Sequence, residues 1–164
     1  MAASARGLDG VTSIEAGAQG RRWLAIALVA VSLASRHALA EDDSSLHELA
    51  ARGDEARLAR AIAMGAPVDE RDPQGRTPLH VAAREGRLFA AMVLVGHHAD
   101  PNARDGRRQT PLHAAAEGTQ REGERFQIVK MLLAKGADPK LRDSAEKRPV
   151  DYARTPEFKE ALAP

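Results

Sequence analysis

The chain has 164 residues, with 24 lysines and arginines against 23 aspartates and glutamates, and it contains no cysteine. The balanced charge excludes a nucleic-acid binder that neutralises phosphates over a broad basic surface, and the lack of cysteine excludes disulfide scaffolds, thiolate metal sites and cysteine nucleophiles. Hydrophobic residues make up 43% of the chain but aromatic residues only 3%, so the core must be aliphatic and rich in alanine. Such a core favours closely spaced helices over a β-sandwich.

The first forty residues have the pattern of a secretory signal peptide. Arg21 and Arg22 precede an uncharged apolar run over residues 23–35, and the small residues Ala38 and Ala40 follow. A basic flank, a short apolar run and a small-residue ending predict a signal peptide over residues 1–40 with cleavage after Ala40, and hence export to the periplasm. A helix over the apolar run would span about 20 Å, which is shorter than the bilayer core, so no stable membrane anchor is expected. A buried core helix is the alternative interpretation.

The rest of the chain repeats with a period of 33 residues. Residues 77–83 (TPLHVAA) recur as residues 110–116 (TPLHAAA), an offset of 33. Residues 66–72 (APVDERD) align with residues 99–105 (ADPNARD) at the same offset. The next such segment, residues 137–143 (ADPKLRD), follows at an offset of 38, so the third unit holds five extra residues. Two independent registers with one period indicate a repeat architecture.

This period and the T-P-L-H-x-A pattern resemble the ankyrin repeat. The resemblance extends over residues 44–164 and implies an all-α solenoid of stacked helix-turn-helix units joined by β-turn or hairpin loops. The predicted mature domain, residues 41–164, then holds two full inner repeats and two degenerate capping repeats, at about residues 44–72, 73–105, 106–143 and 144–164.

Local signals agree with such a unit. Thr77 precedes a proline, so it can cap a helix whose first turn tolerates proline, and this helix is predicted to run to about Glu85 before Gly86 ends it. The next segment, residues 88–95, is apolar nearly all round and must therefore be covered on more than one side. The extra residues of the third unit fall in the polar stretch 118–125, which is expected to be a loop between two helices.

Candidate chemistry is sparse. The resemblance implies that His80 and His113 hydrogen-bond the backbone of a neighbouring turn and tie one repeat to the next. His97, His98 and Asp100 suggest an alternative of another class, a metal-dependent hydrolase. Adjacent histidines on a helix end point in different directions, however, and only one carboxylate is near, so third and fourth ligands for one metal ion are missing. His98 stands where the family has glycine, and histidine tolerates a left-handed backbone better than most residues. We therefore predict no catalytic residue, no metal and no cofactor.

The remaining candidate is a surface. The resemblance implies a protein partner bound on the concave side by turn tips and first helices, through Gln74, Arg76, Arg84, Glu85, Arg107, Arg108, Gln109, Glu117 and Lys147. The basic residues of this set form a patch that favours an acidic partner, unless it is an ordinary solvated face. The predicted function is non-catalytic protein binding by a periplasmic monomer. It would act as an inhibitor or immunity protein, or alternatively as an accessory that stabilises a periplasmic enzyme in oxidative-stress defence.

Overall fold

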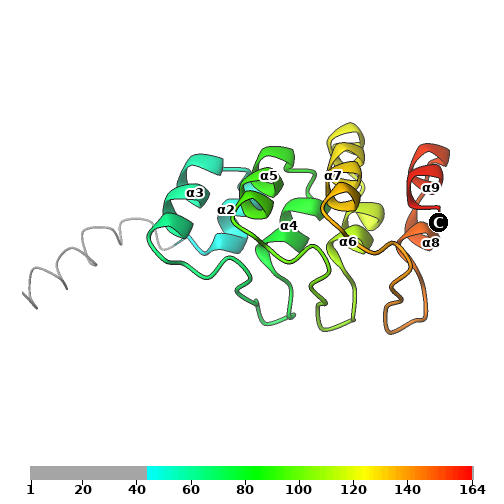
Figure 1. The fold of residues 1–164 in the computed structure, drawn as a ribbon, viewed down its shortest axis with the longest axis horizontal. Coiled ribbons are helices and arrows are strands. Elements are labelled where there is room, and N and C mark those ends of the chain that lie inside the picture. The colour runs from blue at the N-terminus through cyan, green and yellow to red at the C-terminus, as the bar shows by residue number, and fades with distance from the viewer. Residues whose placement is uncertain (1–43, 164) are drawn as a thin grey trace, which may run out of the picture. The chain divides into compact units, whose positions relative to one another are not determined.

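The computed structural model describes residues 44–163, and the predicted signal peptide lies outside the described residues. Within that range the chain forms eight helices and no strand (Figure 1). The helices are α2 (Leu46–Arg52), α3 (Glu55–Ala63), α4 (Pro78–Arg84), α5 (Leu88–Gly96), α6 (Pro111–Glu117), α7 (Glu122–Ala134), α8 (Pro149–Tyr152) and α9 (Pro156–Leu162).

The helices form two rows. Helices α2, α4, α6 and α8 contact one another in sequence and form the inner row, while α3, α5, α7 and α9 form the outer row. Each inner helix also contacts the outer helix that follows it in the chain. Three loops, residues 66–77, 99–110 and 137–148, extend from one edge of the stack (Figure 1) and are called the first, second and third loops below. The predicted all-helical solenoid is confirmed.

The inner helices begin as the Thr-Pro pattern predicts. Thr77 is the extended N-cap residue of α4, with φ −88° and ψ 163°, and Pro78 occupies the first helical position. Thr110 and Pro111 do the same for α6. Proline costs little at this position because the amide it lacks would have no partner inside the helix. The predicted stop at Gly86 is also correct, since its φ is +64°.

The core is built from small and aliphatic side chains, as the composition predicts. Leu79 of α4 and Leu112 of α6 are both fully buried, at equivalent places in successive units. The following alanine pairs, Ala82 with Ala83 and Ala115 with Ala116, are buried as well, which lets helices approach closely. Each buried leucine contributes roughly 2 kcal/mol through removal from water. Because neighbouring units supply most of the covering surface, the stack must form as a whole.

Helix α5 is covered on several sides but not on all of them. It contacts α3, α4 and α7, as its apolar sequence requires. Phe89 and Met92 nevertheless remain 65% and 51% exposed, because an outer helix keeps one face toward solvent.

The expectation of a loop over residues 118–125 is wrong in its second half. Helix α7 begins at Glu122 and has 13 residues against 9 in α5, so part of the insertion extends the helix. Arg125 in this extension is buried, which the polar sequence does not suggest. Its guanidinium donates to the carbonyl oxygens of Gln120 at 2.7 Å and Ala115 at 2.5 Å, and it lies over the ring of Phe158. These contacts satisfy a charge that would otherwise be costly to bury.

Candidate protein-binding surface

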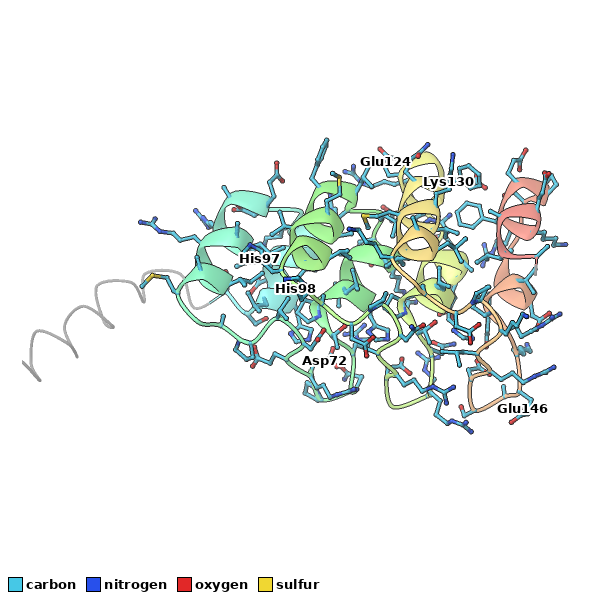
Figure 2. The ribbon with its side chains drawn as sticks, viewed as in Figure 1. Asp72, His97, His98, Glu124, Lys130 and Glu146 are labelled. Carbon is cyan, nitrogen blue, oxygen red and sulfur yellow. The ribbon has the colours of Figure 1, made fainter. Side chains whose placement is uncertain are left out.

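An aspartate organises the tip of each loop. One carboxylate oxygen of Asp72, Asp105 and Asp143 accepts hydrogen bonds from the backbone amides two and four residues later, at 2.8 to 3.0 Å. This arrangement closes a turn over residues 73–76, 106–109 and 144–147, which we call the loop tips. Aspartate suits the position because its short side chain reaches its own following backbone. In Figure 2, Asp72 and Glu146 lie at this edge, opposite Glu124 and Lys130 of α7.

Adjacent tips are joined through their backbones. The amide of Gly106 donates to the carbonyl of Gln74, and the amide of Ser144 donates to the carbonyl of Arg107, both at 2.9 Å. The guanidinium of Arg71 adds bonds to the carbonyls of Gly75 and Arg104. The three tips therefore form one connected edge rather than three independent loops.

Histidines connect the helices to this edge. The Nε2 atoms of His47, His80 and His113 lie 2.8, 3.0 and 3.1 Å from the carbonyl oxygens of Arg76, Gln109 and Lys147, each in the next unit. The role that the resemblance implies for His80 and His113 is confirmed.

The hydrogen bonds fix the tautomer of the buried histidines. A carbonyl oxygen can only accept, so Nε2 of His80 carries the proton, and Nδ1 accepts from the amide of Thr77 at 3.1 Å. His113 and Thr110 repeat this geometry. Burial lowers the pKa of both histidines below the usual 6.5, although the backbone bonds oppose the shift. Both imidazoles are therefore neutral at pH 7.

Asp143 differs from an ordinary turn aspartate because it is buried. It is only 2% exposed, and its second carboxylate oxygen accepts hydrogen bonds from the hydroxyl of Tyr152 at 2.6 Å and from the side-chain amide of Gln109 at 3.4 Å. Burial raises the pKa of Asp143, but the bonds from Tyr152, from the backbone and from Gln109 outweigh it and lower the pKa to about 2. Asp143 is thus a charged anchor for the third tip.

Three non-glycine residues with left-handed backbones lie in this part of the fold. Gly75 in the first tip has φ +76°, and the equivalent positions in the next tips hold Arg108 at +60° and Glu146 at +59°. His98 has φ +65°, as predicted where the family has glycine. A left-handed backbone at Glu146 was not predicted, although Glu146 follows Arg108 at the same offset of 38 that aligns the loops.

The predicted contact residues divide into three groups. Exposed residues at the tips are Gln74, Arg107, Arg108 and Lys147, and half-buried ones are Arg76, Arg84, Glu85 and Glu117. Gln109 is buried, and its inclusion as a surface residue is wrong. It closes the second tip, where its side chain faces Asp143 instead of solvent.

The predicted basic patch is smaller than its sequence suggests. Arg76 forms an ion pair with Asp72 at 2.7 Å, and Arg84 lies 3.9 Å from Glu117 on the next inner helix. Among the described residues, no carboxylate lies within 4.0 Å of the charged groups of Arg107, Arg108 and Lys147. The ammonium of Lys147 lies 5.4 Å from the centre of the Tyr152 ring. These three residues, the tip cations, are the unpaired part of the patch.

The metal alternative gains no support from the geometry. His97, His98 and Asp100 are exposed, and the part of the chain that the structure describes contains no group of three or more histidine or acidic side chains able to hold a metal. No helix within residues 44–163 has the length and apolar character needed to cross a membrane.

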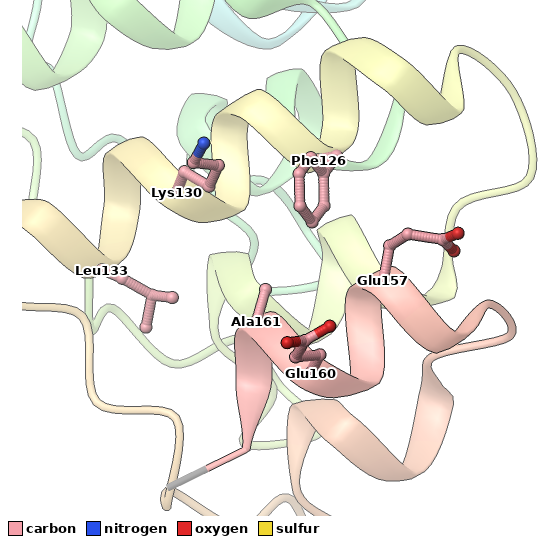
Figure 3. Close-up of a pocket in the computed structure, with 6 residues that line it drawn as sticks. All are labelled: Phe126, Lys130, Leu133, Glu157, Glu160 and Ala161. Atoms are coloured by element: carbon pink, nitrogen blue, oxygen red, sulfur yellow. The ribbon is translucent and has the colours of Figure 1, made fainter.

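A separate groove lies between α7 and α9, on the outer row (Figure 3). It has a volume of about 440 Å³, with Phe126, Leu133 and Ala161 as its apolar lining and Lys130, Glu157 and Glu160 as its charged lining. None of these residues is a nucleophile paired with a base, so the groove lacks the arrangement that nucleophilic catalysis requires.

Comparisons with known proteins agree with the fold. Residues 18–143, more than half of the chain, match the family described as ankyrin repeats in three copies. This match begins inside the segment predicted to be the signal peptide.

Relatives share only a part of their length with this chain. An acyl-CoA-binding domain-containing protein of Arabidopsis thaliana is 45% identical over 34% of this chain and 16% of its own length. An inactive serine/threonine-protein kinase of Mus musculus, TEX14, is 36% identical over 69% of this chain and 7% of its own, and the mouse 2-5A-dependent ribonuclease is 38% identical over 43% and 10%. The chain therefore spans less than a fifth of each relative. With its repeated helix pairs, histidine-tied loops and family match, the chain belongs to the ankyrin repeat family.

Proposed function

We propose that this chain is a non-catalytic protein-binding module, exported to the periplasm, whose partner contacts the three loop tips and the adjoining ends of the inner helices. Ankyrin repeats are general protein–protein interaction modules. The observation that carries the proposal for this chain is the connected edge: backbone bonds between tips hold it in place, and the side chains of Gln74, Arg107 and Lys147 remain exposed. A surface that is ordered before binding loses little conformational entropy on docking.

Export and an inhibitory role are the finer parts of the proposal. Export rests on the basic, apolar and small-residue pattern over residues 1–40. Inhibition of an exported enzyme or toxin suits a rigid edge, because such a surface can cover an active site without refolding.

Photocrosslinking in native host cells tests both parts with separate measurements. A benzoylphenylalanine replaces Ser144 at the third tip, and a control chain carries it at Gln127, an exposed residue of α7. We expect a discrete adduct in the periplasmic fraction from position 144 and none from position 127. The mass of the uncrosslinked chain should lack residues 1–40.

The outcomes separate the two claims. Equal adducts from both positions, or none from position 144, would contradict binding at the tips. A chain that keeps residues 1–40 or stays in the cytoplasm would contradict export alone.

A further inference from the structure

The charges of the loops are arranged asymmetrically. The aspartates that organise the tips point inward and are occupied by backbone amides, and Asp143 is buried. Two of the tip cations, Arg107 and Arg108, are exposed and form no ion pair within the described residues. A chain with nearly balanced charge thus presents locally unbalanced positive charge at the second tip, whereas in the third tip the charge of Lys147 stands beside that of Glu146.

Arg108 is held in a conformation that disfavours a side chain. Its φ of +60° matches that of Gly75 in the preceding tip, and its amide bonds Asp105 at 2.9 Å, so the backbone and not the side chain fixes this geometry. A left-handed backbone is unfavourable for residues with a Cβ. Neither a salt bridge nor a side-chain hydrogen bond within the described residues offsets this for Arg108. Backbone strain of this kind clusters at ligand-binding positions, so it supports a partner contact at Arg108.

Building on the proposed function, we propose that the tip cations Arg107, Arg108 and Lys147 bind an acidic segment of the protein partner, with Arg107 and Arg108 as the specificity-determining residues. Guanidinium groups bind carboxylates through paired hydrogen bonds. The two arginines are adjacent in the sequence and lie on the same hydrogen-bonded turn.

The surroundings of the tip cations favour a carboxylate-bearing protein segment over a uniform polyanion. Glu146 is exposed in the third tip, next to Lys147, and its charge repels a continuous row of phosphates. Nucleic-acid binding also requires many cations along one face, whereas this patch has three. A partner that places acidic residues opposite Arg107 and Arg108, and a basic residue opposite Glu146, fits the whole charge pattern.

Fluorescence anisotropy with the protein purified from its host tests this inference, with a labelled decaglutamate peptide as the probe. We expect binding that weakens with added salt, and an affinity at least about tenfold lower for R107E/R108E. The matched control R60E/R154E makes the same charge change at exposed arginines outside the loops and should stay within about twofold of wild type. R108G should bind about threefold more weakly while unfolding at no lower temperature, since glycine adopts this φ freely.

Several results would overturn the inference. These are no binding of the peptide, equal losses in R107E/R108E and R60E/R154E, or binding of a 20-nucleotide single-stranded DNA as tight as that of the peptide. An adduct from position 144 together with any of these results would leave the proposed function standing and reject only the acidic partner.

Discussion

Replacing Leu112 with aspartate is expected to unfold the entire repeat array. Leu112 is fully buried in α6, and α6 contacts α4, α7 and α8, so the site lies at the centre of the stack. The change removes a buried side chain and places a carboxylate in an apolar environment, for a combined loss of about 5 kcal/mol or more. That is comparable to the total stability of a small domain. Circular dichroism should show the loss of helix at 25 °C.

The apolar surface of α5 offers a matched control. Phe89 is 65% exposed, so Phe89→Asp exchanges an apolar residue for aspartate without a burial penalty. We expect its unfolding free energy to stay within about 0.5 kcal/mol of wild type. If the helices at one end of the array remained intact in Leu112→Asp, the expectation that this short stack folds as a single unit would be wrong.

Acidification below about pH 6.5 is expected to destabilise the protein. Burial lowers the pKa of His80 and His113 in the folded chain, whereas in the unfolded chain these groups keep a pKa near 6.5. Below 6.5 the unfolded chain therefore binds more protons, so stability is full above this pH and falls as the pH decreases toward the lowered folded values. Each histidine contributes up to about 1.4 kcal/mol per pH unit. Protonation also turns Nδ1 into a donor that faces the threonine amide.

Denaturant melts across this range would measure the effect. H80N/H113N should have a flatter pH dependence, because it lacks the two titrating imidazoles. The variant should still cap its helices, since an asparagine oxygen can accept a hydrogen bond from the threonine amide, just as Asp151 accepts from the amide of Arg148 at 2.7 Å. H97N/H98G alters two exposed histidines and should keep the steep dependence. An identical slope in wild type and H80N/H113N would show that these histidines do not cause the pH dependence.

A second loss of stability between about pH 4 and 2 is expected from Asp143, whose folded pKa is about 2.

The fold was accessible from sequence because its determinants are local and repeated. Thr77 and Pro78 mark a helix start by backbone chemistry alone, and the equivalence of Leu79 and Leu112 follows from one offset. The histidine bonds could be assigned only through the family, since the carbonyls they reach lie 29 to 34 residues away.

The surface was harder to predict because exposure depends on partners distant in the chain. Gln109 and Arg108 are neighbours with similar polarity, yet Gln109 is buried by an aspartate 34 residues later while Arg108 points outward. Arg125 looked like part of a polar loop, but the extended α7 buries it against α6 and α9. Ion pairs with acidic side chains likewise leave Arg76 and Arg84 outside the unpaired part of the basic patch. Position in the repeat predicts which residues lie near the edge, and only the contacts between units decide which are available.

We expect the binding edge to be ordered before any partner arrives, and amide hydrogen exchange of the free protein measures this order. The amides of Gly106 and Ser144, which join successive tips, should exchange at least about a hundredfold more slowly than in an unstructured peptide. Exchange of these two amides at the unstructured rate, with the helices still protected, would show that the edge is not preformed and becomes ordered only on binding.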